Sequence, residues 1–319
     1  MRFVDPLHGW IGTDDGILGT KDGGITWDKQ LTGASIARLW SYDGTRAWAM
    51  DNANSLYRTI DGSHWTPIVP KPDPPIMELD VFSADVLFAI GLSPTTAPAP
   101  SPRTGNVMRS DDGGVTWQVV GTHTMWSVCF DTPTDGIGAE AKQVFRTGDG
   151  GRTWFPIATL PINDDGPYWY PTVACPNGTN VRLQITEPGV ALGHAPYLVY
   201  RTNDAGRTWT LEFREPYTRG STTPPDTAAL GSYPSTFGAL AGGRTWFVTC
   251  TPAADAQRFV LLGPGGETLA RGTVPIVQYC GSAQLIDRSH VVAVSAYPAS
   301  VIATDDGGAT WRTIYPGTP

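Results

Sequence analysis

One short motif recurs along the whole chain and constrains its fold more than any other feature. It reads Ser or Thr, any residue, Asp, any residue, Gly, any residue, Thr, Trp. Full copies lie at 20–27, 110–117, 147–154, 202–209 and 304–311, and 59–65 is the same motif one residue short. A decayed copy at 262–269 keeps the Gly and Thr positions but has lost the Asp and the Trp. The copies divide the chain into seven units of about 45 residues, a period that indicates a repeat architecture.

Each unit contains four short runs rich in Val, Phe, Tyr, Trp and Thr, separated by Gly, Asp, Asn and Pro, which is typical of strands joined by turns. No segment has a helical period. We therefore predict an all-β fold, a single seven-bladed β-propeller of four-stranded antiparallel blades over residues 1–319. The blades are expected at 1–32, 33–70, 71–121, 122–158, 159–214, 215–272 and 273–319.

The Asp of each motif is expected to hold the turn between the third and fourth strands of its blade. Its carboxylate can accept hydrogen bonds from N–H groups of the turn, while the Gly permits a positive φ. Turns spread around the rim of a propeller cannot converge on one ligand. We therefore predict a structural role, without bound metal or cofactor, for Asp22, Asp61, Asp112, Asp149, Asp204 and Asp306.

Charge and hydropathy exclude several classes of partner. The net charge is −8 and no basic run occurs, so neither a nucleic acid nor an anionic membrane surface is expected to bind. No apolar stretch approaches the roughly 18 residues of a membrane span. The first residues lack the apolar core of a signal peptide. We expect a monomer.

The four cysteines lie far apart and show no spacing typical of zinc sites. Buried free thiols and one or two disulfides both remain open. Cys250 and Cys280 fall on neighbouring blades at one face, so they form the most plausible pair. Cys129 and Cys175 fall on inner strands, where we expect them to pack as small apolar residues.

The longest loops gather on the face opposite the motif turns, and long loops in a compact fold are often functional. They carry aromatic residues flanked by carboxylates, which suit a sugar or a peptide, although a rigid aromatic plug or a solvated surface explains them equally. The candidate binding residues are Asp164, Asp165, Tyr168, Trp169, Tyr170, His194, Tyr217 and Arg219.

First strands line the central channel of a propeller, which adds Arg38, Glu78, Asp80 and Trp126 to the candidates. A shift of one residue in register would reverse their faces, and channel charges can also form a water-filled network. A glycosidase needs two carboxylates about 5–10 Å apart. If the protein is an enzyme, Glu78 with Asp80, or Asp164 with Glu187, are the candidate pairs.

The repeated motif resembles the Asp-box, or BNR repeat, of sialidases, two-propeller xyloglucanases, sortilin-type receptors and Ycf48-like photosystem II assembly factors. The start of the first unit, Phe3-Val4-Asp5-Pro6-Leu7-His8-Gly9-Trp10, is most similar to the Ycf48-like group. That resemblance implies seven blades, an extracytoplasmic location and binding to another protein. The Arg-Ile-Pro motif of sialidases is not present in the sequence.

These observations favour a non-catalytic, extracytoplasmic scaffold that binds a protein or peptide on its loop-rich face. A carbohydrate-active enzyme, either a glycoside hydrolase or a polysaccharide lyase, and a lectin-like glycan binder are the alternatives. Both would use the aromatic and acidic loops of blades four to six.

Overall fold

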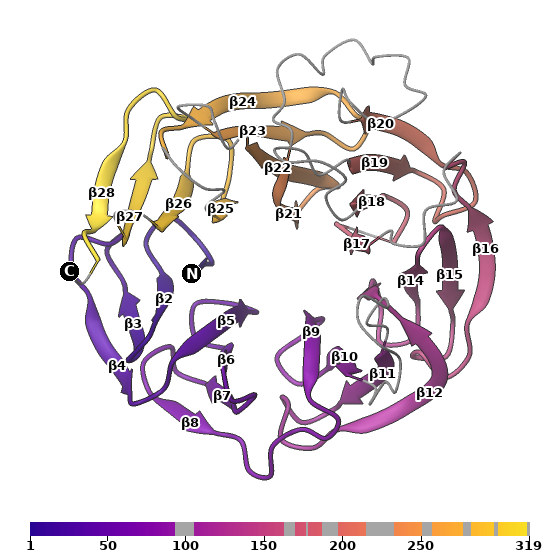
Figure 1. The fold of residues 1–319 in the computed structure, drawn as a ribbon, viewed down its shortest axis with the longest axis horizontal. Helices are drawn as coiled ribbons and strands as arrows, with labels where there is room; N and C mark the ends of the chain where they lie inside the picture. The colour runs from indigo at the N-terminus through magenta and orange to yellow at the C-terminus, as the bar shows by residue number, and fades with distance from the viewer. Residues whose placement is uncertain are drawn as a thin grey trace. The chain divides into compact units, whose positions relative to one another are not determined.

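The computed structural model describes residues 1–92, 105–162, 170–176, 178–186, 197–214, 233–250, 257–276, 282–296 and 299–317. Their strands form seven four-stranded antiparallel sheets, each in sequence order, and no helix occurs among them. The fold is a seven-bladed β-propeller, as the repeat predicts (Figure 1). The chain divides into two compact units. Unit 1 comprises Met1–Ser93 and Gly105–Thr122, and unit 2 comprises Pro94–Thr104 and His123–Pro319.

Unit 1 contains the first three blades. Blade 1 consists of β1 (Arg2–Phe3), β2 (Gly9–Thr13), β3 (Gly16–Thr20) and β4 (Asp28–Thr32). Blade 2 consists of β5 (Ile36–Ser41), β6 (Ala47–Asp51), β7 (Leu56–Thr59) and β8 (Trp65–Pro67). Blade 3 consists of β9 (Ile76–Val81), β10 (Leu87–Leu92), β11 (Gly105–Ser110) and β12 (Gln118–Met125), whose last residues fall in unit 2.

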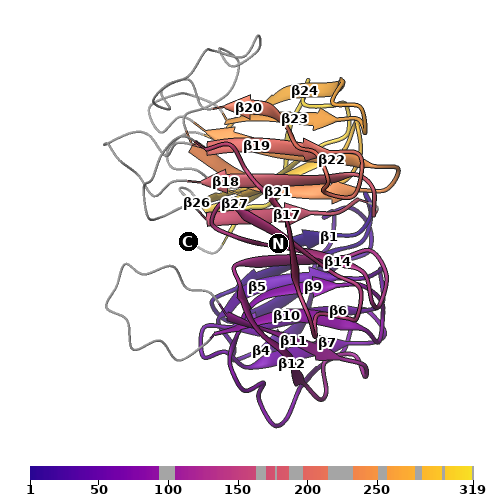
Figure 2. The ribbon, with the colours of Figure 1, turned by 90° about the vertical axis from the view of Figure 1, so that its right-hand side faces the viewer.

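Unit 2 contains the last four blades. Blade 4 consists of β13 (Ser127–Phe130), β14 (Gly136–Glu140), β15 (Gln143–Thr147) and β16 (Phe155–Thr159). Blade 5 consists of β17 (Tyr170–Ala174), β18 (Val181–Thr186), β19 (Tyr197–Thr202) and β20 (Thr210–Arg214). Blade 6 consists of β21 (Tyr233–Leu240), β22 (Arg244–Cys250), β23 (Gln257–Leu262) and β24 (Thr268–Val274). Blade 7 consists of β25 (Ser282–Leu285), β26 (Val291–Ala296), β27 (Ala299–Thr304) and β28 (Arg312–Tyr315). Figure 2 shows β17, β18 and β19 as neighbouring ribbons, in agreement with their antiparallel pairing.

The repeated motif forms the turn between the third and fourth strands, here called the motif turn. In blade 5, the Thr202 hydroxyl donates to Asp204 at 2.7 Å and accepts from the N–H of Gly206 at 3.0 Å. Asp204 also accepts from the N–H and the hydroxyl of Thr208, at 2.9 and 2.6 Å. The indole of Trp209 donates to the Gly206 carbonyl at 3.0 Å. Because the side chains satisfy the turn's own polar groups, the motif specifies a turn of fixed shape.

The decayed copy in blade 6 keeps a turn without the Asp and the Trp. There the N–H of Gly263 donates to the Glu267 carbonyl at 2.8 Å, and the N–H of Gly266 donates to the Gly263 carbonyl at 3.1 Å. Gly266 has a φ of 91°, which only glycine adopts readily. Backbone hydrogen bonds therefore replace the carboxylate in this blade.

Each blade has a turn face and a loop face. The turn between the first and second strands lies beside the motif turn, since Gly23 donates to the Leu7 carbonyl at 2.9 Å and Gly150 to the Thr134 carbonyl at 2.9 Å. We call this side of a unit its turn face. The opposite side carries the turns between second and third strands and the connections between blades, and we call it the loop face.

The hydrophobic cores lie between neighbouring blades. One cluster joins Trp10 and Ile17 of blade 1 to Ala47 and Trp65 of blade 2. Further clusters join blades 2 and 3, blades 4 and 5, blades 5 and 6, and blades 6 and 7. A blade therefore buries its apolar faces only against its neighbours, which explains why the units repeat.

Candidate functional site

Most of the loop residues that the sequence predicts as binding residues lie outside the described parts of the chain. These are Asp164, Asp165, Tyr168, Trp169, His194, Tyr217 and Arg219. Glu187, the candidate catalytic partner of Asp164, lies outside the described residues too. Tyr170 is the first residue of β17. Their role in binding stays a prediction.

Arg38 and Glu78 line one pocket in unit 1. The pocket has a volume of about 260 Å³ and is lined by Met1, Ala37, Arg38, Leu39, Trp40 and Glu78. Its walls come from the inner strands β5 and β9 of two neighbouring blades and from Met1, which directly precedes β1. We call it the inner-strand pocket. Two residues that the sequence proposes separately as channel residues are therefore neighbours in space.

Local irregularities in the two inner strands place these side chains. The pairing of β5 with β6 shifts register between Ile36 and Arg38. The pairing of β9 with β10 shifts register opposite Ile90 and Gly91, just before Glu78. A β-bulge bends its strand and re-aims the following side chain, and bulges are common beside binding sites. Both pocket residues thus follow a bulge in the half of the strand nearer the loop face.

The inner-strand pocket combines a cation, a carboxylate and apolar surface. Arg38 is exposed, and its guanidinium makes no hydrogen bond or ion pair with any residue that the structure describes. Leu39 and Trp40 are half-buried beside it. Glu78 is half-buried on β9 and has partners of its own. The arrangement offers unused guanidinium donors next to an indole.

Asp80 lies on the same face of β9 as Glu78, because residues two apart in a strand share a face. Leu79 between them points the other way into the core and is 5% exposed. Trp126 belongs to unit 2. We expected it on an inner strand, but it lies one residue before β13. Its N–H donates to the Ala139 carbonyl at 3.0 Å, which holds it at the end of blade 4.

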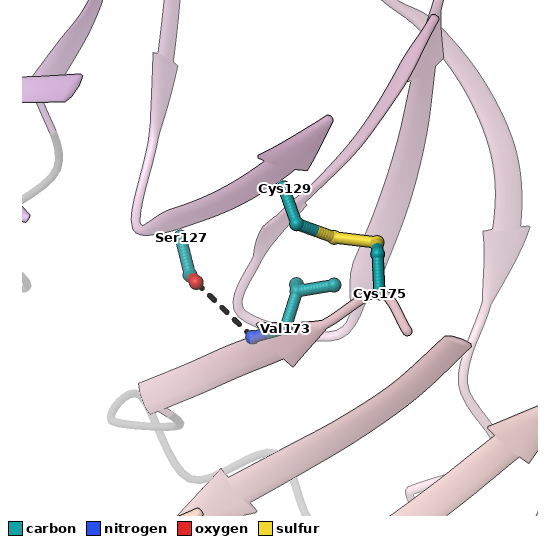
Figure 3. The surroundings of a disulfide bond; sticks show 4 residues. All are labelled: Ser127, Cys129, Val173 and Cys175. Carbon is teal, nitrogen blue, oxygen red and sulfur yellow. Dashed lines mark hydrogen bonds between the residues drawn. A yellow bond between two sulfur atoms is a disulfide. The ribbon is translucent and has the colours of Figure 1, made fainter. Parts of the chain in front are cut away.

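The structure corrects the expectation for one pair of cysteines. Cys129 and Cys175, which we expected to pack as free apolar residues, form a disulfide with a Cα–Cα distance of 5.9 Å (Figure 3). Two residues before each cysteine, the N–H of Val173 donates to the Ser127 hydroxyl at 3.1 Å. Inner strands β13 and β17 therefore lie in register, which brings the equivalent cysteines together. The side chain of Cys250 and all of Cys280 lie outside the described residues, so that pair stays a prediction.

The disulfide forms part of the wall of a larger pocket on the turn face of unit 2. This pocket has a volume of about 520 Å³, and its lining includes Asp131, Asp135 and Arg146. Arg146 lies 3.6 Å from the Asp135 carboxylate, which also accepts from the Thr132 hydroxyl at 3.0 Å. Sequence reasoning missed this pocket because it ranked the loop face first.

The carboxylates of the motif turns have pKa values that fit their hydrogen bonds. The hydroxyl and the N–H of Thr26 lower the pKa of Asp22 to about 2. At Asp112 partial burial raises the pKa, but the Thr116 hydrogen bonds outweigh it and the pKa is lowered. The pKa is lowered to about 2 by the same turn contacts at Asp149, Asp204 and Asp306, and it is also lowered at Asp61. A carboxylate held ionised in this way is a poor proton donor near neutral pH.

In the described part of the chain, no group of three or more His, Cys, Asp or Glu side chains is arranged to hold a metal ion. No helix there is long and apolar enough to cross a membrane.

No protein-family model matches the sequence, and no curated protein sequence is similar enough to count as a relative. Among solved structures, the chain is similar to Ycf48 bound to a D1 peptide, with a TM-score of 0.55 and 13% identity over 98% of this chain and 86% of the other. The fold is shared. Ycf48 from Cyanidioschyzon merolae has a TM-score of 0.51 and 15% identity, covering 96% of this chain and 92% of its own.

An ancestral GH74 enzyme has a TM-score of 0.60 and 14% identity over 99% of this chain. The match covers 46% of the enzyme, so this chain spans about half of its length. At such identities the likeness to all three structures shows a common propeller fold, and function has to be argued from the sites.

Proposed function

We propose that this propeller is a non-catalytic binding protein that takes a peptide segment of a partner protein in the inner-strand pocket. The observation that carries the proposal is the meeting of Arg38 and Glu78, each placed by a bulge, beside Trp40. The protein acts as a monomer in this proposal.

The chemistry of the pocket favours a peptide that carries an acidic group. The unpaired guanidinium of Arg38 can bind a carboxylate through two parallel hydrogen bonds. Trp40 and Leu39 offer apolar contact for the neighbouring side chain, and Glu78 can accept from a peptide N–H. A volume of about 260 Å³ lies just below the range of pockets that enclose a drug-sized ligand, so it suits one or two side chains of an extended segment.

Two further observations support this reading. The structural neighbour Ycf48 was solved with a D1 peptide, so a propeller of this fold can bind a peptide. The disulfide between Cys129 and Cys175 supports an extracytoplasmic location, because disulfides persist mainly in oxidising compartments.

Fluorescence anisotropy with labelled synthetic peptides tests the proposal. The peptides place Asp or Glu beside a Leu or Phe, and matched peptides carry Asn or Gln instead. Wild-type protein should bind the acidic set, and Arg38→Ala should weaken that binding at least about tenfold, the loss of a charge-assisted hydrogen bond. Arg46→Ala is the control, since it removes the same charge from the turn face of blade 2. Equal binding of the acidic and amide peptides, or no effect of Arg38→Ala, would contradict the proposal.

A carbohydrate-active enzyme is the second candidate, because Glu78 and Asp80 share one face of β9. Residues two apart in a strand lie about 6–7 Å apart, within the range that glycosidase carboxylate pairs span. The similarity in fold to the ancestral GH74 enzyme is compatible with this candidate. Release of reducing sugar or unsaturated product from a polysaccharide panel, abolished by Glu78→Gln and by Asp80→Asn, would support catalysis. Alanine variants of Asp164 and Trp169 test whether the predicted loops take part.

A further inference from the structure

Four large apolar side chains are exposed together on the turn face of unit 1. Leu7 is 53% exposed, Ile25 78%, Tyr42 48% and Ile60 71%. Each lies in a turn of blade 1 or blade 2, on the side opposite the inner-strand pocket. We call these four residues the apolar turn patch.

Contacts between the turns show that the four turns are neighbours. The N–H of Gly23 donates to the Leu7 carbonyl at 2.9 Å, which joins the two turns of blade 1. Lys21 donates to the Ser63 hydroxyl at 3.0 Å, which joins the motif turns of blades 1 and 2. A Cβ atom at Gly44 would lie 3.8 Å from the side chain of His8, so the turns that carry Leu7 and Tyr42 approach each other closely. All four turn tips are therefore neighbours on one surface.

The other blades show that the turns do not require these apolar residues. The position of Ile25 in the motif holds Arg152 in blade 4 and Arg207 in blade 5. The position of Ile60 holds Asp111 in blade 3 and Asp305 in blade 7. In the turns of all these blades, the motif Asp accepts the same hydrogen bond from the N–H of the motif Thr.

At the position of Leu7, other blades also carry polar residues. It is Thr45 in blade 2 and Thr134 in blade 4, in turns whose first N–H donates to the carbonyl of the last residue, as in blade 1. Not every equivalent position is polar, since blade 3 carries Val115 at the position of Ile25 and blade 1 carries Val4 at that of Tyr42. What distinguishes blades 1 and 2 is that four large, exposed apolar side chains lie on neighbouring turns, and such a group indicates a contact surface.

The charges around the patch are mostly negative. Asp5, Asp22, Asp43 and Asp61 lie in the same turns, against Lys21 and Arg46. Partial burial raises the pKa of Asp5 and Asp43, but turn hydrogen bonds outweigh it, and similar bonds lower the pKa of Asp22 and Asp61. All four carboxylates therefore remain ionised near neutral pH. The patch therefore consists of apolar tips within a rim of fixed negative charge.

We infer that the apolar turn patch is a second docking surface, which binds a basic, amphipathic segment of a partner protein. Apolar side chains of the segment contact Leu7, Ile25, Tyr42 and Ile60, while flanking Lys or Arg side chains approach the carboxylates. Charge complementarity favours this occupant over a second copy of the chain, because a symmetric contact would bring the same carboxylates together in a protein of net charge −8. The surface is separate from the inner-strand pocket and does not depend on the function proposed for it.

The chain itself supplies substitutions that the turns accept. The variant Leu7→Thr/Ile25→Arg/Ile60→Asp places at each position a residue that another blade carries there. The probe is a labelled synthetic peptide in which Leu and Ile alternate with Lys and Arg, and a matched peptide carries Glu in place of the basic residues. Wild-type protein should bind the basic peptide, with weaker binding at higher salt, and the triple variant should bind at least about tenfold more weakly.

Two controls keep the test specific. Val119→Thr removes another exposed apolar side chain from unit 1 and should leave binding unchanged, and circular dichroism should show an unchanged fold for every variant. Arg38→Ala should also leave it unchanged, which separates this surface from the inner-strand pocket. Equal binding of the Glu peptide, or unchanged binding by the triple variant, would overturn the inference. So would self-association of the wild-type protein that the triple variant abolishes in sedimentation, because the occupant would then be a second copy.

Discussion

The guanidinium of Arg182 donates two hydrogen bonds to the carboxylate of Glu212, at 2.7 and 3.2 Å, with both side chains buried in blade 5. Arg182 also donates to the Gly263 carbonyl in the turn of blade 6 at 2.7 Å. In unit 1, Trp48 does the same from blade 2, since its indole donates to the Gly113 carbonyl of blade 3 at 2.9 Å. In both places a side chain of one blade donates to a turn carbonyl of the next blade. The donor is an ion-paired guanidinium in blade 5 and an indole in blade 2.

Removing the charge of Glu212 should destabilise the fold. Glu212→Gln leaves two guanidinium groups without their counter-charge: that of Arg182, which is 1% exposed, and that of Arg201, whose Nε lies 2.7 Å from the same carboxylate. Breaking a buried ion pair from one side costs about 3–5 kcal/mol. Urea denaturation followed by tryptophan fluorescence should show a loss of this size. A loss below about 1 kcal/mol would mean that the pair is solvated.

A triple variant provides the control for that measurement. Arg182→Met/Arg201→Met/Glu212→Leu removes all three charges of this cluster at once and keeps apolar volume between blades 5 and 6. Replacing a buried ion pair by apolar residues is often neutral or stabilising, so this variant should be more stable than Glu212→Gln alone.

The hydroxyl of the motif Thr should contribute measurably to stability. Thr147 is 1% exposed and accepts from the buried N–H of Gly151 at 3.0 Å. Thr147→Val keeps the shape but leaves that N–H unsatisfied, at a cost of about 1–3 kcal/mol. Thr66→Val on the exposed strand β8 is the matched control and should have little effect. Thermal denaturation compares the two, and equal melting temperatures would show that the motif hydroxyl is dispensable.

The lowered pKa values of the motif carboxylates predict a pH dependence of stability. In the unfolded chain these groups take up protons near pH 4, whereas in the folded chain the pKa is about 2 for Asp22, Asp149, Asp204 and Asp306. The folded state therefore binds fewer protons in this window, and stability is lost as the pH falls from about 4 towards 2. Melting temperatures across this range should fall more steeply for wild-type protein than for Asp204→Asn. If the melting temperatures of the two proteins fell in parallel with pH, Asp204 would not contribute to the pH dependence of stability.

Reduction of the disulfide should weaken the link between blades 4 and 5. The bond closes a loop with a sequence separation of 46 residues, for which the chain-entropy model gives about 4 kcal/mol. Cys129→Ala/Cys175→Ala should lose stability of this order, and a reducing agent should destabilise the wild-type protein but not the variant. Mass spectrometry of alkylated protein checks the premise, since labelling of Cys129 without reduction would contradict it.

The repeat alone was enough to predict the propeller, because its motif encodes a complete turn in local hydrogen bonds. Other similarities are hidden because different residues perform the same function. Asp5 with His8 in blade 1, Asp43 with Arg46 in blade 2, and Asp287 with His290 in blade 7 close equivalent turns. Only the first of these matched a family pattern by sequence.

The candidate sites were less predictable, since they depend on contacts between blades. The directions of the Arg38 and Glu78 side chains depend on one bulge in each strand, and the sequences of β5 and β9 contain no pattern that predicts these bulges. The pairing of Cys129 with Cys175 needed the register of β13 against β17, which only the packing of neighbouring blades provides.

Hydrogen exchange measured by mass spectrometry, with and without the acidic peptide that binds most tightly, tests the central claim most directly. The account predicts slower exchange in β5 and β9, which carry Arg38 and Glu78, and no such change in the Arg38→Ala variant. Unchanged exchange in both strands, with protection confined to other parts of the chain, would contradict peptide binding at the inner-strand pocket.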